Sequence, residues 1–407
     1  MIQSITYCVI VSLMVNLAVS VSHQVESTTL HFPFSPSINV IPEDAYRKLL
    51  FRRQNDSDEL SLIFTGDPQY YYPCTTANRD CKKKSAECYK QYHEMLRQQQ
   101  AAASKKKTQV SSHGQEGDVA ECVKIESTAA NEVQRKSIFD LNRNMQSKPR
   151  GLIINGDITN FGHIHQLALF KNEWLTLPIQ IYAGLGNHDY ENNVNDCVAN
   201  LCAENMLSWF VEEYAKKANL SLDHSQSNEL WRSAHEGSLA YSKDICSDNG
   251  NCIHLIQLHN RPDYATSITA SSTQWNIRGS FSWMANDLQS IRNRTWPVLI
   301  NLHNYNQKVA TRLIPALEQW MNSTENQFVI RRVMVLFAHI HENHSVRVKC
   351  IGGVTVPFIY VGSVPNNRYT LIKFHHNENA EIFLLKANAN STLSVPGIMD
   401  FVWRPCN

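Results

Sequence analysis

Two short apolar runs decide the fold of this chain: Gly151-Leu-Ile-Ile-Asn-Gly-Asp157 and Ile179-Gln-Ile-Tyr-Ala-Gly-Leu-Gly-Asn187-His188-Asp189. Between them, apolar residues recur at helical spacing from His165 to Leu175. Runs of this kind, without polar alternation, are typical of strands buried on both faces of a sheet. The pattern therefore predicts a strand–helix–strand unit in which each strand ends in glycine followed by a polar side chain.

Three further apolar runs end in a carboxylate or an imidazole: Leu60 to Asp67, Pro297 to His303, and Arg332 to His341. In α/β sheets, the groups that do chemistry lie just beyond the carboxyl ends of the strands. We therefore expect the side chains at these five strand ends to converge on one crevice: Asp67, Asp157, Asn187, His188, His303, His339 and His341.

Carboxylates, amide oxygens and imidazoles together form a mixed set of oxygen and nitrogen ligands. Such a set suits divalent or trivalent first-row metals, and it lacks the thiolate that marks a structural zinc site. A single histidine at a strand end is more often an ordinary hydrogen-bonded residue. Five strand ends that all carry ligand-type groups predict a metal site instead.

With these motifs in this order, the sequence resembles the calcineurin-like metallophosphoesterases over about residues 60 to 385. The resemblance implies an α/β fold, a four-layered α/β/β/α sandwich with mixed sheets, and a centre of two metal ions (Mn, Fe, Zn or Mg). By position, Asp67 and His341 would hold one metal, and Asp157 would bridge both. Asn187, His303 and His339 would hold the second metal. The matching motifs are Gly66-Asp67-Pro68-Gln69, Gly156-Asp157, Gly186-Asn187-His188-Asp189, Asn301-Leu302-His303 and Ala338-His339-Ile340-His341.

The resemblance also implies a reaction. Two metal ions would lower the pKa of a shared water molecule to near neutrality, supply the resulting hydroxide in line with phosphorus, and neutralise charge on the phosphoryl oxygens. By position, His188 would protonate the departing oxygen and Asp189 would orient the His188 ring. We expect a secreted phosphatase or phosphodiesterase whose substrate is a phosphorylated small molecule or macromolecule.

Two positions depart from the family pattern. Many members have His two residues after the first Asp, where this chain has Gln69, and another branch has Tyr three residues after the bridging Asp, where this chain has Asn160. Gln69 offers the first metal only a neutral amide oxygen, which favours a hard ion such as Mn, Mg or Fe(II) over Zn. The alternative function is that of a secreted binding protein that keeps the fold with weakened catalysis.

Residues beside the strand ends are candidates for substrate contacts, with an ordinary loop role as the alternative for each. Asn160 and His163 follow Asp157, and Arg261 lies at the end of another apolar run. A guanidinium group can hold a phosphate through two parallel hydrogen bonds. We therefore include these three residues in the predicted site.

Composition and the N-terminus indicate export. The formal net charge of +1 gives no nucleic-acid-binding signature. The apolar run from Ile5 to Val21 predicts a signal peptide over residues 1–22, with a single-span anchor as the alternative. No later run is long enough to span a membrane, and we expect the mature chain to be a monomer. Six N-glycosylation triplets agree with export: Asn55, Asn219, Asn293, Asn322, Asn343 and Asn390.

Cysteine usage agrees with an oxidising compartment. Removal of the signal peptide takes away Cys8 and leaves ten of the 11 cysteines, an even number without CxxC spacing. Disulfides are therefore expected rather than zinc knuckles. Cys197 with Cys202 and Cys246 with Cys252 are plausible local pairs, and the other pairings stay open.

These patterns predict four regions along the chain. Residues 1–22 are the signal peptide, 23–59 an irregular lead-in, 60–385 the metallophosphoesterase domain, and 386–407 a C-terminal tail. Residues 74–122, rich in Cys, Lys and Gln, predict an insertion in the domain. Periodicity predicts further helices at 131–145, 202–218, 283–291 and 312–321, and antiparallel strands within 354–385.

Overall fold

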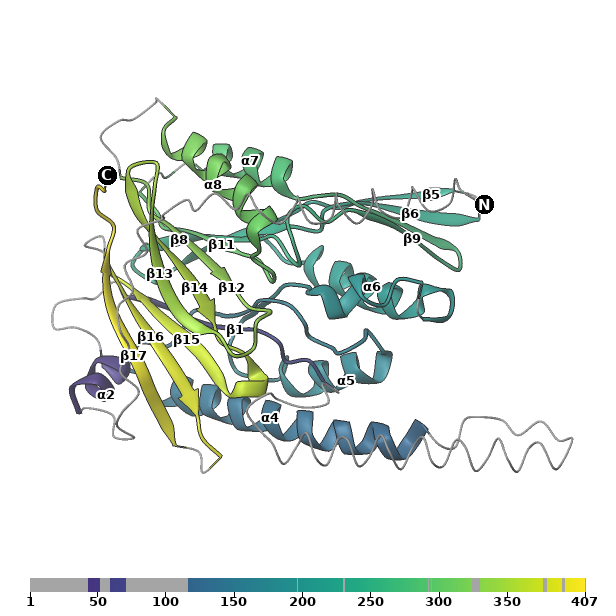
Figure 1. The fold of residues 1–407 in the computed structure, drawn as a ribbon, viewed down its shortest axis with the longest axis horizontal. Coiled ribbons are helices and arrows are strands. Elements are labelled where there is room, and N and C mark those ends of the chain that lie inside the picture. The colour runs from purple at the N-terminus through teal and green to yellow at the C-terminus, as the bar shows by residue number, and fades with distance from the viewer. Residues whose placement is uncertain are drawn as a thin grey trace, which may run out of the picture. The chain divides into compact units, whose positions relative to one another are not determined.

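Helices cover the outer faces of two mixed β-sheets in the computed structural model of this chain (Figure 1). The structure describes residues 43–51, 59–70, 116–195, 197–229, 231–291, 293, 295–323, 330–375, 379–389 and 392–406. These residues belong to one compact unit. The predicted signal peptide and residues 74–115 of the predicted insertion lie outside the described residues.

The first sheet has six strands in the order β17-β16-β15-β1-β2-β3. Strands β1, β2 and β3 run parallel, and all of their residues are buried, as expected for apolar runs without alternation. Strands β15, β16 and β17 continue the sheet with antiparallel pairing. The strands are β1 (Leu60–Thr65), β2 (Leu152–Ile154), β3 (Ile181–Ala183), β15 (Arg368–Phe374), β16 (Asn379–Ala387) and β17 (Leu393–Val402).

The second sheet has seven strands in the order β13-β14-β12-β11-β8-β7-β4. Strands β8, β11, β12 and β14 run parallel, whereas β13 and β7 pair antiparallel with their neighbours. The strands are β4 (Leu220–Leu222), β7 (Tyr241–Cys246), β8 (Cys252–Gln257), β11 (Val298–Asn301), β12 (Val333–Phe337), β13 (His344–Ile351) and β14 (Val354–Val361).

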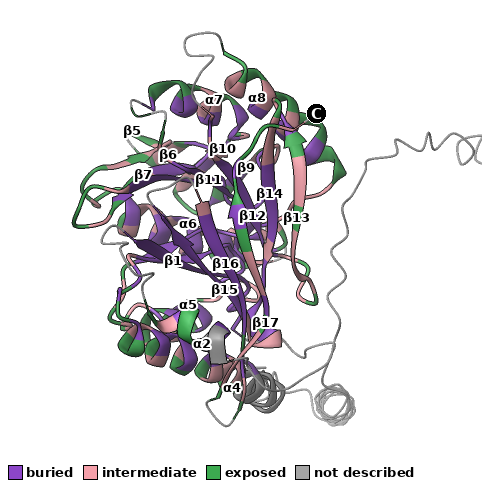
Figure 2. Cartoon of the chain, turned by 90° about the vertical axis from the view of Figure 1, so that its left-hand side faces the viewer, coloured by how far each residue is buried: buried purple, intermediate pink, exposed green. Residues whose placement is uncertain are grey.

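The core between the layers follows from the alternation of side chains along the parallel strands. In the second sheet, Leu299 and Met334 pack toward the core that includes the first sheet. Their neighbours Ile300 and Val335 pack into a separate core with helices of the outer layer. Figure 2 shows inner strands such as β1 and β15 as buried, whereas the edge strand β13 is mostly intermediate or exposed. Burial on both faces explains why β2 and β12 consist of apolar residues alone.

Helices form the two outer layers. Helices α7 (Phe281–Ser290) and α8 (Gln307–Met321) lie beyond the second sheet, and α4 (Glu116–Asn144) and α5 (Ile164–Glu173) lie beyond the first (Figure 1). This order confirms the predicted four-layered α/β/β/α sandwich with mixed sheets. In the described residues, no helix combines the length and the hydropathy needed to cross a bilayer.

A third, four-stranded sheet was not predicted. Its order is β5-β6-β10-β9, and its strands carry many polar residues, such as the run Ser225-Gln-Ser-Asn-Glu229. Because such runs lack both apolar alternation and apolar continuity, the sequence gives no strand signal there. The strands are β5 (Ser225–Glu229), β6 (Arg232–Gly237), β9 (Thr266–Ala270) and β10 (Thr273–Ile277).

Element boundaries differ from expectation in several places. The predicted lead-in includes helix α2 (Glu43–Leu50), and the predicted tail includes β17. Helix α8 begins five residues before the predicted start, where the Asn306 side chain accepts a hydrogen bond from the N–H of Val309. The remaining elements are the helix α6 (Leu201–Tyr214) and the short helices η2 (Asn187–Glu191), η3 (Val198–Asn200) and η4 (Val364–Asn366).

Candidate metal centre

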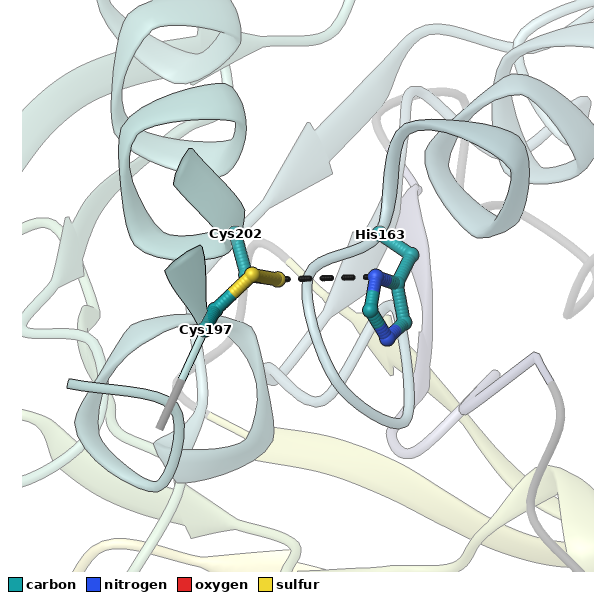
Figure 3. Close-up of side chains that lie close together, drawn as sticks. All are labelled: His163, Cys197 and Cys202. Carbon is teal, nitrogen blue, oxygen red and sulfur yellow. Dashed lines mark hydrogen bonds between the residues drawn. A yellow bond between two sulfur atoms is a disulfide. The ribbon is translucent and has the colours of Figure 1, made fainter. Parts of the chain in front are cut away.

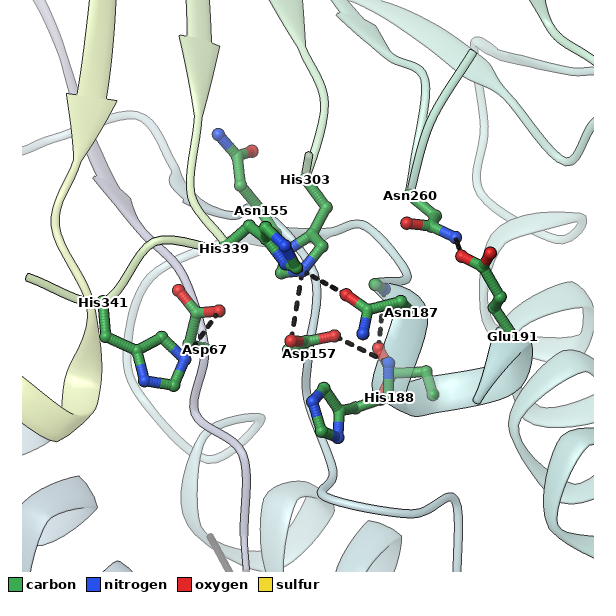
Figure 4. A network of polar contacts seen from close by, with 12 residues as sticks. Asp67, Asn155, Asp157, Asn187, His188, Glu191, Asn260, His303, His339 and His341 are labelled. Atoms are coloured by element: carbon green, nitrogen blue, oxygen red, sulfur yellow. Dashed lines mark hydrogen bonds and ion pairs between the residues drawn. The ribbon is translucent and has the colours of Figure 1, made fainter. Parts of the chain in front are cut away.

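The loops that follow β1, β2, β3, β11 and β12 meet at one place between the two sheets (Figure 4). Glycine in the motifs allows this close approach. A Cβ atom on Gly186 would lie 2.1 Å from Oδ1 of Asp157, and one on Gly66 would lie 2.3 Å from Cβ of Ala338. The glycines of the sequence motifs are therefore explained by contact between loops rather than by turns alone.

Four of the predicted ligands have a left-handed backbone. The φ angles are 55° at Asp67, 38° at Gln69, 52° at Asp157 and 69° at His339. Residues other than glycine rarely adopt this conformation, and it persists where the surroundings enforce it, often at functional sites. Hydrogen bonds from the N–H of Asp67 to the carbonyl of Gly156 (3.0 Å) and from Gln69 to Asp157 (2.8 Å) enforce it here.

One cluster of ligand-type side chains surrounds His303. Its Nε2 atom lies 3.1 Å from Oδ2 of Asp157, 3.0 Å from Oδ1 of Asn187 and 3.1 Å from Nδ1 of His339. The ligand atoms of Asp157, His303 and His339 all lie within 4.8 Å of one another. The structure thus brings together the residues that the resemblance assigned to the second metal.

A backbone contact fixes the ring of His303. Because a carbonyl oxygen can only accept, the Nδ1–H group of His303 donates to the carbonyl of Asn155 at 2.8 Å. This contact leaves Nε2 directed at Asp157 and Asn187. Metal-binding histidines in proteins are commonly oriented in this way by a second hydrogen bond.

A second cluster lies on the other side of Asp157 in Figure 4. Nε2 of His341 is 3.4 Å from Oδ1 of Asp67. Asp67 and Gln69 are fully buried, and no side-chain oxygen or nitrogen of either residue forms a hydrogen bond with the described residues. Buried polar groups without partners are costly and uncommon. A cation fits this position, because the carboxylate of Asp67, the amide oxygen of Gln69 and the imidazole of His341 are suitable ligands.

The carboxylates hold positive charge at the centre. Burial alone would raise the pKa of Asp157, but the charge of His303 outweighs it and keeps the pKa well below its usual range. In turn, burial opposes protonation of His303, but Asp157 raises the pKa of the imidazole to about 9. Burial and the charge of His303 lower the pKa of His339 to about 4. A metal ion binds the neutral imidazole, so its binding would release the proton of His303, and the carboxylate of Asp157 that now stabilises this proton would then stabilise the cation.

His188 lies beside Asp157, as predicted, but a different group orients it. The backbone N–H of His188 donates to Oδ1 of Asp157 at 2.9 Å, and its ring Nδ1–H donates to the carbonyl of Asn160 at 2.8 Å. Asn160 therefore contacts the site through its backbone carbonyl.

Asp189 has another role than the predicted orientation of His188. Its carboxylate accepts hydrogen bonds from the backbone N–H groups of Gly186 (2.8 Å), Thr159 (2.9 Å) and Ile158 (3.1 Å). It thereby ties the loop after β2 to the loop after β3. Burial, and next the charge of Asp157, raise the pKa of Asp189 to about 6.

Arg261 and His163 lie beside the centre, engaged with other groups. Nη2 of Arg261 donates to Oε1 of Glu191 at 3.0 Å, so its guanidinium is part of an ion pair. Nδ1 of His163 lies 3.4 Å from Sγ of Cys202, which forms a disulfide with Cys197 (Figure 3).

Sequence reasoning missed residues that support the ligands. Glu191, at the end of η2, accepts a hydrogen bond from the side chain of Asn260 as well as from Arg261 (Figure 4). These bonds attach the helix that carries Asn187 to the loop after β8. The only signal in the sequence was that Glu191 stands four residues after the ligand candidate Asn187. Nδ1 of the buried His259 accepts from the N–H of Leu185 at 3.0 Å.

Three disulfides are present in the described residues. The predicted pairs Cys197–Cys202 and Cys246–Cys252 are confirmed. The third, Cys350–Cys406, joins residues 56 positions apart, and its pairing was left open. Cys74, Cys81 and Cys88 lie outside the described residues.

This chain shows only limited similarity to known proteins. No protein-family model matches the sequence, and no curated protein sequence is similar to it. Similar solved structures include a purple acid phosphatase from yellow lupin (Lupinus luteus) seeds, with a TM-score of 0.45 and 8% identity, and the NAD nucleotidase of Haemophilus influenzae, with a TM-score of 0.39 and 12% identity. The match to the phosphatase covers 85% of this chain and 55% of the phosphatase chain, and the match to the nucleotidase covers 83% of this chain and 59% of the nucleotidase chain. At TM-scores below 0.5, the interpretation of the site depends on its own geometry.

Proposed function

We propose that this chain is a metal-dependent hydrolase of phosphoric esters, of the calcineurin-like metallophosphoesterase type. The observation that carries the proposal is the convergence of three imidazoles, two carboxylates and two amides from five strand ends. The buried amide of Gln69 forms no hydrogen bond with the described residues, and the buried carboxylate of Asp67 contacts His341, a second ligand candidate; both observations add support. Asp157 lies between the two clusters, where a carboxylate can bridge two cations (Figure 4).

Two bound metal ions would activate water and neutralise phosphoryl charge. Asp67, Gln69 and His341 would hold one ion, Asn187, His303 and His339 the other, and Asp157 both. The backbone contact of Nδ1 with Asn160 leaves Nε2 of His188 to give a proton to the departing oxygen.

We further propose that the protein functions in an oxidising compartment, as a secreted protein. Disulfides persist in such compartments and are rare in the cytosol. Three disulfides in the described residues support this location. The signal peptide and glycosylation belong to the same proposal and are tested by N-terminal sequencing and glycosidase treatment of the secreted chain.

The test compares two buried histidines. His303 contacts the ligand set, whereas His254 on β8 is held by Asp244 and Asp287, so His254→Gln is a control for loss of a buried imidazole. Metal content is measured by elemental analysis, and hydrolysis is measured with an aryl phosphomonoester and an aryl phosphodiester after addition of Mn, Zn, Fe or Mg. We expect close to two metals per chain in the parent and in His254→Gln, and loss of metal and turnover in His303→Gln.

Two results would contradict the proposal. Equal metal content and turnover in the parent and in His303→Gln would refute the site. If the parent chain hydrolyses neither ester with any of the added metals, the result would support the alternative, a binding protein that keeps the fold. The ester that is hydrolysed faster decides between a phosphatase and a phosphodiesterase.

A further inference from the structure

Three exposed apolar side chains lie in two segments near His188. The exposed fractions are 67% for Ile164, 84% for Val198 and 44% for Leu201. We call these three residues the apolar rim. The segments that contain them, residues 160–165 and 197–201, have no Asp, Glu, Lys or Arg. Apolar side chains gathered on a surface commonly mark a binding site.

Covalent and polar contacts bring the two segments together. His163, which precedes Ile164, contacts Sγ of Cys202 at 3.4 Å (Figure 3). Cys202 follows Leu201 and is linked by its disulfide to Cys197, which precedes Val198. Each residue of the apolar rim is thus adjacent in the sequence to His163, Cys197 or Cys202, the three residues that form this contact. The three apolar side chains therefore belong to two segments that contact each other.

The backbone that presents Val198 is held in an unfavourable conformation. The φ angles of Asn195, Ala199 and Asn200 are 65°, 51° and 56°. The Asn200 side chain enforces this conformation by accepting from the N–H of Asn195 (2.6 Å) and donating to the carbonyl of Thr269 (2.9 Å). Such strain clusters at ligand-binding sites. Here it accompanies an aliphatic side chain directed to solvent.

A single amide connects the segment 160–165, which carries Ile164, with His188. Nδ2 of Asn193 lies 3.2 Å from the carbonyl oxygen of Phe161, 3.3 Å from that of His188 and 3.0 Å from that of Asp189. Asn160, in the same segment as Phe161, orients the His188 ring. The segment that carries Ile164 therefore adjoins His188, and the segment that carries Val198 and Leu201 contacts it through His163 and Cys202.

We propose that the apolar rim binds the apolar part of the leaving group, so that the substrates are phosphoric esters of an apolar alcohol. This inference rests on the proposed function. In the reaction, a water oxygen bonds to phosphorus and loses a proton to the solvent, the P–O bond to the alcohol breaks, and the proton from Nε2 of His188 converts the alkoxide into the alcohol. His188 then takes up a proton from the solvent. The leaving group must lie next to its proton donor, and thus next to the rim. The apolar part is either an alkyl chain or a ring.

The experiment uses esters with equal chemistry at the reacting atoms. Ethyl, octyl and 2-phenylethyl phosphate are all esters of primary alcohols, so differences in kcat/KM report binding of the apolar part. Methyl-, octyl- and 3-phenylpropylphosphonate, which cannot be hydrolysed, measure the same preference as affinity by calorimetry. Burial of apolar surface strengthens binding by roughly fourfold per methylene group. We expect kcat/KM for the octyl ester or for the phenylethyl ester to exceed kcat/KM for the ethyl ester at least tenfold. A higher kcat/KM for the octyl ester would identify an alkyl chain as the apolar part, and a higher kcat/KM for the phenylethyl ester would identify a ring.

The variants are Ile164→Ser with Val198→Ser, and Val402→Ser as the control. Both rim side chains are mostly exposed, so their replacement leaves folding unchanged, and Val402 is an exposed apolar residue on β17, at the far edge of the first sheet. The rim variant should lose the tenfold preference and retain activity on ethyl phosphate, whereas Val402→Ser should behave as the parent.

The outcomes separate this inference from the function on which it rests. Equal kcat/KM for all three esters, or a preference that survives in the rim variant, overturns the inference and leaves the hydrolase intact. A parent chain that hydrolyses none of the esters refutes the proposed function. In that case a tenfold phosphonate preference that the rim variant loses still supports the binding site, and equal phosphonate affinities refute it.

Discussion

Replacement of Gly186 by alanine tests whether contact between loops positions the metal ligands. The added Cβ would lie 2.1 Å from Oδ1 and 2.4 Å from the backbone N of Asp157, although real Cβ contacts are essentially never shorter than 3.0 Å. The two loops must therefore separate by about 0.9 Å, which is the difference between 3.0 and 2.1 Å. Overpacking of this kind costs about 1–3 kcal/mol of stability, and a misplacement of about 1 Å in an active site lowers activity roughly 100-fold.

The assay combines metal content, kcat/KM for an aryl phosphate, and the unfolding midpoint in urea. Gly151→Ala is the matched control, since its Cβ would lie 2.8 Å from the Tyr182 ring at the opposite end of the same strands. Both variants should lose stability, but Gly186→Ala alone should lose metal and activity. If Gly186→Ala keeps the parental metal content and kcat/KM, the close approach of these loops does not position the ligands.

Three further predictions follow from individual contacts. Asp157→Asn should lower metal affinity and turnover roughly 100-fold or more, because it removes the carboxylate between the clusters; elemental analysis and kinetics measure this, and parental metal affinity would contradict it. Although burial opposes protonation, Asp244 and Asp287 raise the pKa of His254 to about 9. Since this exceeds the usual value of 6.5, His254 stabilises the fold fully below about pH 6.5, and about 3 kcal/mol should be lost as the pH rises to 9. Urea unfolding should show this loss in the parent but not in His254→Gln, and equal pH profiles would refute it. Cys350→Ser should destabilise the chain by about 4 kcal/mol and Cys197→Ser by about 2 kcal/mol, because the entropy of the unfolded chain depends on the loop that a disulfide closes. The separations are 56 and 5 residues, and the reverse order of unfolding midpoints would contradict the reasoning.

The sequence predicts the parts of the fold in which one physical constraint dominates. Strands β1, β2, β11 and β12 are buried on both faces, so their apolar runs are visible without the structure. The residue after each run was therefore identifiable as a ligand candidate. Strand β5 has no such constraint, because its residues are polar and it pairs only with β6 at a sheet edge.

The supporting contacts of the site could not be predicted from the sequence, because they depend on where loops cross. The family resemblance implies that Asp189 orients the ring of His188. In the structure it accepts backbone hydrogen bonds from Ile158 and Thr159, some 30 residues earlier. The same reason applies to Glu191, whose partners Asn260 and Arg261 are about 70 residues away.

The candidate metal centre draws its ligands from both sheets. Asp67, Gln69, Asp157 and Asn187 follow strands of the first sheet, whereas His303, His339 and His341 follow strands of the second. A metal centre with ligands from both sheets would oppose sliding of one sheet over the other. Because such an ion binds only the folded arrangement, its affinity adds to the free energy of unfolding. Resistance to unfolding would thus report the concentration of free metal around the protein, independently of any substrate.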